Sequence, residues 1–408
     1  MDERDRTETF DHLFAGTVRD AVEGSTYGAW RAISAPEAAS LSFGFPFPEA
    51  FPTGELAAAT QTLLDEDPEG PLQYGSGEDT ERLVEGIAER AKQRGIDAEA
   101  DEILVTSGAT HAVDVVCRTF LERGDAVFLG VPTFMGTLYV FENYGVDVVG
   151  FEIDATGVDV EAVAEALRTR REDGRPIPKL LYTIPNFQNP TGATLSLDRR
   201  RRLLELAEEF DFVIVEDDAY GELRYDGEDV PPLAALDEAG RVIHVGSFSK
   251  TIAPGVRTGY AIAHEEILDG MNLVDSGGTN TFVRSILGRY FAEGHYEANL
   301  EALRTAYRDR RDHMLDCLDE HLPDECEWSE PDGGFFVWVE LPEGLDAEEL
   351  LPEAAEEGVT YLPGSMFYPD DGGERSLRLS FSYVPYEEME RGVQALARAV
   401  RLALDGED

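Results

Sequence analysis

The chain has 408 residues, 42% of them hydrophobic, and this length favours one large domain joined to a smaller one. Its 83 Asp and Glu residues against 34 Lys and Arg give a formal net charge of -49, which makes nucleic acid and anionic membranes poor partners. Because molar salt shortens the Debye length to ~3 Å and screens the self-repulsion of such a chain, the composition predicts a halophilic protein, with an acidic mesophilic protein as the alternative.

Short apolar runs alternate with helical patterns through much of the chain. Strands are predicted at residues 102–105, 126–131, 146–151, 179–184, 212–216, 242–246 and 260–263, and helices at residues 111–121, 138–144, 159–168 and 197–210. Continuous apolar strands that alternate with helices indicate an α/β fold, with a large and mostly parallel sheet covered by helices on both faces. Such a fold binds its ligands beyond the carboxyl ends of the strands.

The pattern changes near residue 304. Two helical stretches flank strand-like runs at residues 335–340 and 376–382, which predicts a smaller α+β domain. We therefore divide the chain into an N-terminal segment, residues 1–45, that packs with the small domain, a large domain, residues 46–303, and a small C-terminal domain, residues 304–408.

The cysteines and histidines predict no metal site and no disulfide framework. Cys117, Cys317 and Cys326 form no CxxC motif, their number is odd, and the seven histidines are scattered without metal-ligand spacing. The acidic N-terminus MDERDRTETF lacks the apolar run of a signal peptide, and no stretch approaches the ~18 apolar residues of a membrane helix. The expected location is the cytoplasm, with no membrane partner.

Lys250 is one of only three lysines in the chain, with Lys92 and Lys179. It follows the apolar run 242–246 through the residues SFS, at the strand end where a ligand site is expected. An amine can form a Schiff base, whereas a guanidinium at physiological pH cannot. On the residues alone, this chemistry and an ordinary snorkelling lysine both remain open.

Three motifs carry a family resemblance: GSFSKTIAPGVRTGY at residues 246–260, IPNFQNPTG at 184–192 and VIVEDDAY at 213–220. Together they resemble the class I/II aminotransferases of fold type I, in particular the 2-aminoadipate and kynurenine aminotransferases and the aminotransferase half of related transcriptional regulators. The resemblance implies pyridoxal 5'-phosphate (PLP) as cofactor. It also implies ping-pong transfer of an amino group from an L-α-amino acid to a 2-oxo acid, with 2-oxoglutarate as the expected acceptor.

The resemblance assigns catalytic roles to residues in these motifs. Lys250 is expected to hold the cofactor as an aldimine and then to move the proton from the substrate α-carbon. Asp217 is expected to pair with the pyridine nitrogen, and Tyr220 and Asn189 to hydrogen-bond the phenolic oxygen of the ring. The alternatives are a solvated acidic turn for Asp217 and an Asn-Pro turn former for Asn189.

The phosphate of the cofactor needs hydrogen-bond donors and positive charge. The strand-to-helix junction at residues 107–110 favours an anion through its backbone N–H groups and the helix dipole. Hydroxyl groups and a guanidinium from the lysine motif add to it. The candidate phosphate-binding residues are Ser107, Gly108, Ala109, Thr110, Ser247, Ser249 and Arg257.

The family match also implies contacts to the ring, to the substrate and from a second subunit. Phe134 is expected to stack on the cofactor ring, where many relatives have Tyr. Arg378 is expected to bind the substrate α-carboxylate, with Gly44 nearby, although Phe43 replaces a glycine of the family pattern. Tyr74 matches a tyrosine that reaches the phosphate of the partner subunit, which implies a homodimer. A locally packed loop aromatic for Tyr74 and an outward-facing strand residue for Arg378 are the alternatives.

Other functions fit parts of the same sequence. A PLP-dependent lyase or decarboxylase would have the same cofactor site and different products. A PLP-binding sensor would need a basic DNA-binding domain before Ser42, and the acidic residues there do not fit one. An inactive scaffold is disfavoured because the motif residues are all retained.

Overall fold

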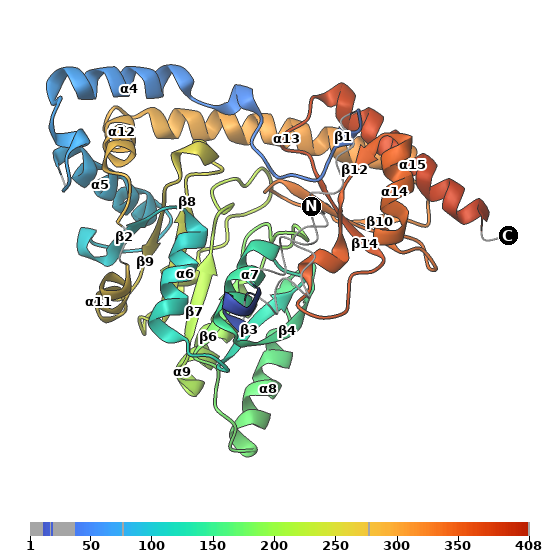
Figure 1. Cartoon of the computed structure of the whole chain (residues 1–408), viewed down its shortest axis with the longest axis horizontal. Helices are drawn as coiled ribbons and strands as arrows, with labels where there is room; N and C mark the ends of the chain where they lie inside the picture. The colour runs from blue at the N-terminus through green and yellow to red at the C-terminus, as the bar shows by residue number, and fades with distance from the viewer. Residues whose placement is uncertain (1–10, 17, 19–36, 76, 276–277, 407–408) are drawn as a thin grey trace.

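The computed structural model of the chain describes residues 11–16, 18, 37–75, 77–275 and 278–406 (Figure 1). Within these residues an α/β fold forms around an eight-stranded mixed sheet, with a second, four-stranded sheet toward the C-terminus. The predicted fold class is confirmed.

The large sheet is parallel through its centre and antiparallel near both edges. Strands β8, β7, β6, β3 and β4 run parallel, whereas β9 runs antiparallel to β8 and β2, and β5 runs antiparallel to β4. Across the sheet the order is β2 (Ile103–Thr106), β9 (Gly259–Ile262), β8 (Val242–Ser247), β7 (Val213–Asp217), β6 (Leu180–Thr183), β3 (Ala126–Val131), β4 (Asp147–Asp154) and β5 (Gly157–Val158).

Helices cover both faces of this sheet. Successive residues of a strand point to opposite faces, so neighbouring residues of one strand pack against different helices. Val127 and Leu129 of β3 pack in one apolar cluster with α6 (Ala109–Phe120), α7 (Met135–Tyr144) and α11 (Glu265–Val274). Phe128, between them, packs in another with α8 (Val160–Glu172) and α9 (Leu197–Phe210). The short α10 (Leu233–Leu236) joins the second cluster through its buried leucine.

Local sequence signals explain where these helices begin and end. The Ser196 hydroxyl caps α9 by accepting a hydrogen bond from the backbone N–H of Arg199 at 3.4 Å. Gly145 ends α7 at a φ of 62°, a left-handed conformation that favours glycine. The predicted helices agree with the structure to within a few residues; α7 begins at Met135 rather than at residue 138.

Outside the sheet, α4 (Thr53–Glu66) and α5 (Glu78–Gln93) pack against α12 (Thr281–Ala292). The long helix α13 (His295–His321) then runs from α12 to α15 (Tyr386–Gly406), as Figure 1 shows. The predicted domain limit at residue 303 falls within this continuous helix. The division of the chain into domains stays a prediction.

The C-terminal part forms the predicted smaller sheet, in the order β10 (Glu327–Trp328), β11 (Phe336–Glu340), β14 (Ser376–Ser380) and β13 (Leu362–Pro363), all antiparallel. Helices α14 (Ala347–Glu357) and α15 pack against each other beside it. Strand β1 (Ala39–Ser40) pairs in parallel with β12 (Val359–Thr360), which brings residues 39–40 to the C-terminal part of the molecule.

The predicted packing of residues 1–45 concerns many residues outside the described ranges and stays a prediction. Among the described residues, no helix combines the length and the apolar character that crossing a membrane requires.

Candidate active site

A cavity of about 440 Å³ opens at the carboxyl ends of the central parallel strands. Lys250 follows β8, Asp217 ends β7, Asn189 follows β6 and Phe134 follows β3, so four neighbouring strands each deliver a predicted residue to it. The predicted residues that line this cavity are Gly44, Ala109, Thr110, Phe134, Asn189, Asp217, Tyr220, Ser247, Ser249, Lys250, Arg257 and Arg378.

Lys250 is partly buried, and its Nζ donates a hydrogen bond to the carbonyl oxygen of Gly44 at 2.9 Å. Burial lowers the pKa of the Lys250 amine to about 8, and the positive charges of Arg378 and Arg257 act in the same direction. An amine with a lowered pKa at a cavity wall is available as a base or nucleophile near neutral pH. This setting favours the Schiff-base role over an ordinary snorkelling lysine.

Asp217 is buried, and its two carboxylate oxygens differ. Oδ2 accepts a hydrogen bond from the hydroxyl of Tyr182 at 2.7 Å, whereas Oδ1 is buried without a hydrogen-bond partner. Burial raises the pKa of Asp217 to about 6; the Tyr182 hydrogen bond opposes this rise.

The acidic run around Asp217 is not the solvated turn that the sequence left open. Glu216 is fully buried and accepts hydrogen bonds from the backbone N–H groups of Leu233 and Ala234, while His244 Nδ1 lies 2.9 Å from its Oε2. Asp218, which follows Asp217 in the chain, forms an ion pair with Arg94. Each acid therefore has its own structural setting.

A buried polar chain surrounds Asp218. Arg94 pairs with its carboxylate, and the side-chain amide of Asn186 donates to it at 2.6 Å. Burial would raise the pKa of Asp218, but the charge of Arg94 dominates and the pKa falls to about 2. Asp218 is thus engaged away from the cavity, which leaves Asp217 as the carboxylate on its wall.

Backbone donors and a cation meet at the N-terminus of α6. The guanidinium of Arg257 donates to the carbonyl oxygen of Ser107 at 3.2 Å, and Arg257 has a left-handed φ of 45°. Gly108 has a φ of 95°, and a Cβ there would lie 2.7 Å from Arg257 Nη2. Ser107 and Gly108 therefore border Arg257, while Ala109 and Thr110 line the cavity itself.

Arg378 on β14 is buried, so the outward-facing alternative is wrong. Its guanidinium donates to Asn189 Oδ1 at 2.8 Å and to the carbonyl oxygen of Ser42 at 2.6 Å, and its carbon Cζ lies 4.0 Å from the ring centroid of Phe336. Burial lowers the pKa of Arg378 to about 9. Its Nε has no hydrogen-bond partner, which leaves donor capacity for a ligand.

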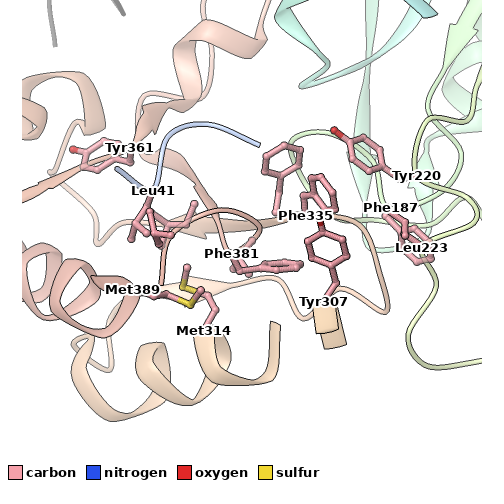
Figure 2. Close-up of a cluster of buried hydrophobic side chains, with 14 of the residues drawn as sticks. Leu41, Phe187, Tyr220, Leu223, Tyr307, Met314, Phe335, Tyr361, Phe381 and Met389 are labelled. Atoms are coloured by element: carbon pink, nitrogen blue, oxygen red, sulfur yellow. The ribbon is translucent and has the colours of Figure 1, made fainter. Parts of the chain in front are cut away.

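Tyr220 belongs to an aromatic cluster that joins the two parts of the molecule (Figure 2). Its ring lies 5.4 Å from that of Phe335, which in turn lies 4.6 Å from the ring of Tyr307 on α13. Lys250 Nζ lies 5.7 Å above the Tyr220 ring. Packing on three sides holds Tyr220 at the cavity wall.

Tyr74 is not part of this cavity. Its side chain is 99% exposed on the loop after residues 70–72, so the alternative of a locally packed aromatic is wrong. It lies beside residues 278–282, away from Lys250.

The sequence did not single out several residues of the site. Tyr182, within β6, bonds to Asp217, and Phe336, Met135 and Leu362 form part of the cavity wall. All four lie in apolar or strand-like runs, where nothing in the pattern separates a core side chain from one at a site.

Comparison with known proteins identifies the family and the fold. The family model for aminotransferase class I and II matches residues 49–396. The chain belongs to the class I and II aminotransferases. It is 38% identical over 366 residues to aromatic-amino-acid aminotransferase 1 of Thermococcus litoralis, covering 89% of this chain and 88% of the relative. It is also 38% identical to the 2-aminoadipate transaminase of Thermus thermophilus, covering 90% of this chain and 91% of the relative.

The solved kynurenine aminotransferase of Pyrococcus horikoshii, in complex with PMP, has a TM-score of 0.91 to this aminotransferase at 34% identity, covering 98% of this chain and 99% of that one. The resemblance found in the motifs is therefore confirmed, and the protein is a PLP-dependent aminotransferase.

Proposed function

We propose that the cavity is the site of amino transfer, with Lys250, Asp217 and Arg378 as its principal groups. The observation that carries the proposal is their convergence. An amine, a carboxylate with an unpartnered oxygen and a buried guanidinium line one space of about 440 Å³. Amino transfer requires a group to hold the cofactor, a group to pair with its ring nitrogen and a group to bind the substrate carboxylate.

When bound, PLP supplies a carbonyl carbon that takes up the amino group and a ring that withdraws electrons from the substrate α-carbon. The residues fit it at both ends. Oδ1 of Asp217 is buried without a donor, and a protonated ring nitrogen would provide one. Arg257, with the first N–H groups of α6, provides charge and donors for a phosphate. Ser247 and Ser249 line the same end.

The other side chains at the cavity wall have separate roles in the proposed reaction. Lys250 would hold the cofactor at rest, and its free amine would take the proton from the substrate α-carbon. Its pKa of about 8 leaves a useful fraction of neutral amine near pH 7. Arg378 orients the α-carboxylate, and Asn189, bonded to Arg378, couples that orientation to the cofactor side. Tyr220 faces the ring from the aromatic cluster.

The cavity wall favours an apolar or aromatic amino acid as the donor. Phe43 and Phe45 stack with ring centroids 5.2 Å apart and an interplanar angle of 7°, and both line the cavity with Leu362 and Met135. Among the described lining residues the cationic side chains are those of Lys250, Arg257 and Arg378. These three cations are assigned to the cofactor and to the α-carboxylate of the substrate. Among the described lining residues, no further cationic side chain can pair with a second substrate carboxylate.

This wall also bears on the acceptor. 2-Oxoglutarate, which the family resemblance implies, would bring its second carboxylate against apolar rings. We therefore expect a lower KM for phenylpyruvate than for 2-oxoglutarate. Kinetics with both acceptors and a constant amino donor would test this order, and a lower KM for 2-oxoglutarate would contradict the substrate assignment.

We further propose a homodimer in which Tyr74 reaches the partner's phosphate site. Its 99% exposed ring lies near another exposed apolar side chain, Leu72 at 67%. If the protein sediments as a monomer and still has full activity, this role of Tyr74 is contradicted. The net charge of -49 supports activity in molar salt and a halophilic enzyme.

The deciding experiment is a near-visible absorbance spectrum of the purified holoenzyme during addition of single amino acids. The cofactor band is expected to bleach with aromatic or apolar amino acids and to return when a 2-oxo acid is added. Amino-acid turnover that releases carbon dioxide or ammonia without forming a new amino acid would favour a lyase. A protein that binds no PLP in molar salt would overturn the proposal.

A further inference from the structure

The two oxygens of Asp217 have different surroundings. Oδ2 accepts the Tyr182 hydroxyl at 2.7 Å, and Oδ1 is buried at the cavity wall without a partner. A carboxylate free to rotate about its last bond could exchange these oxygens. A strong hydrogen bond to one of them removes that freedom, because exchange would first require breaking it.

Tyr182 is itself held in a fixed direction. It is fully buried on β6, and its ring packs edge-on against Phe141 of α7, with centroids 5.9 Å apart and an interplanar angle of 81°. Thr137, also on α7, donates its hydroxyl proton to the Tyr182 oxygen at 3.1 Å. Since a phenol has one proton and Thr137 already donates to its oxygen, the Tyr182 proton is directed to Asp217.

We propose that Tyr182, supported by Thr137, is a positioning residue that holds Oδ2 of Asp217 and so presents Oδ1 as an ionised acceptor to the cofactor ring nitrogen. The inference rests on the proposed role of Asp217. Tyr182 touches neither substrate nor cofactor in this arrangement, and it acts only through the carboxylate.

The electrostatic surroundings support this role. Burial and the neighbouring charge of Asp218 raise the pKa of Asp217, while the Tyr182 hydroxyl, the Ala219 backbone N–H and His244 on β8 lower it. Lys250, Arg257 and Arg378 are the cations among the described residues that line the same cavity. Burial raises the pKa of Tyr182 well above its usual value, so the phenol stays protonated and remains a donor.

Removal of the phenol hydroxyl tests the proposal. Tyr182→Phe keeps the ring and deletes the donor to Oδ2, so the pKa of Asp217 rises and the carboxylate is both less ionised and less firmly held, with the Ala219 backbone N–H still beside it. We expect PLP binding to the cofactor-free protein to weaken about tenfold, the scale of a hydrogen bond to a charged group. The acid limb of PLP affinity against pH should move to higher pH, because Asp217 then becomes protonated earlier as pH falls.

A matched control separates positioning from general stability. Tyr361 is also fully buried and donates its hydroxyl to the carbonyl oxygen of Ala347 at 2.7 Å, within the C-terminal part. Tyr361→Phe should lower the thermal unfolding temperature comparably but leave PLP affinity and its pH profile unchanged. Thr137→Val, which keeps the phenol, should weaken PLP binding by less than Tyr182→Phe.

PLP affinity is measured by titration of the cofactor-free protein, without reference to turnover, on these variants and on Asp217→Asn. Wild-type affinity and acid limb in Tyr182→Phe, with strong loss in Asp217→Asn, would overturn the role of Tyr182 and leave the proposed function standing. Unchanged affinity in Asp217→Asn would overturn the proposed function itself. A loss in Tyr361→Phe equal to that in Tyr182→Phe would show a merely structural effect.

Discussion

The carbonyl oxygen of Gly44 accepts a hydrogen bond from Lys250 Nζ at 2.9 Å, although the two residues are 206 positions apart. Gly44 follows β1 closely, and a Cβ on it would overlap the ring of Phe336 on β11. The segment that touches the lysine is therefore packed on the small-domain sheet. Its position depends on the absence of a side chain at residue 44.

Gly44→Ala is expected to displace this segment and lower kcat/KM by about tenfold, since overpacking costs about 1–3 kcal/mol and its strain falls on the contact to Lys250. Steady-state kinetics at fixed salt would measure the loss. Gly54→Ala is the matched control, because a Cβ at Gly54 meets nothing within 4 Å. Equal activity in the two variants would show that the close packing at Gly44 is unimportant.

Lys250→Met is expected to abolish amino transfer and to stabilise the cofactor-free protein at pH 7. The pKa of Lys250 is lowered to about 8 from 10.5, so below pH 8 the folded wild type buries an ammonium. Between pH 8 and 10.5 the unfolded chain binds more protons than the folded one, and the wild type gains stability as pH rises.

The advantage of Lys250→Met, roughly 2 °C in unfolding temperature, should therefore shrink across that window. Thermal unfolding of both cofactor-free proteins at pH 7 and pH 10.5 would measure it. A difference that is constant with pH would mean that Lys250 is not a buried charge in the folded state.

Arg378→Lys is expected to raise the KM for the amino donor about tenfold or more with a smaller change in kcat. A lysine cannot reproduce the planar fork that bonds Asn189 and Ser42 while leaving Nε for a ligand. Arg375→Lys serves as control, since the Arg375 guanidinium donates to the carbonyl oxygen of Leu341 and does not line the cavity. An unchanged KM in Arg378→Lys would mean that the carboxylate binds elsewhere.

Raising the salt concentration from about 0.1 to 1 M is expected to raise the unfolding temperature of the wild type by several degrees. The Debye length falls from ~10 to ~3 Å over that range, which screens repulsion among the excess acidic side chains. Calorimetry with a chloride salt would show the trend, and sodium sulfate would control for preferential exclusion. An unfolding temperature independent of salt would reject the halophilic interpretation.

The order of strands and helices in the large domain was predictable because buried parallel strands produce apolar runs that helical patterns separate. Strand direction was not predictable in the same way. Residues 259–262 form a strand near the predicted one, yet β9 runs antiparallel to both neighbours, and apolar periodicity is the same for either direction.

Site residues could be predicted from the sequence where the chemistry needs an unusual residue type. Lys250 is such a residue, because the chain has only three lysines. The contact of Tyr182 with Asp217 could not be predicted, because a tyrosine within the apolar run LLYT resembles any core aromatic residue. Only the pairing of β6 with β7 brings the two side chains together. The Gly44 contact was hidden for a related reason. It depends on pairing across the length of the chain, which local patterns do not record.

The pairing of β1 with β12 has a consequence for the order in which the enzyme is made. Ala39 is synthesised 320 residues before its partner Val359. The eight strands that carry Lys250 and Asp217 are complete long before that point. The nascent chain therefore carries Lys250 and Asp217 before Arg378 is added, and the cavity lacks its proposed carboxylate-binding guanidinium until residue 378 has been synthesised.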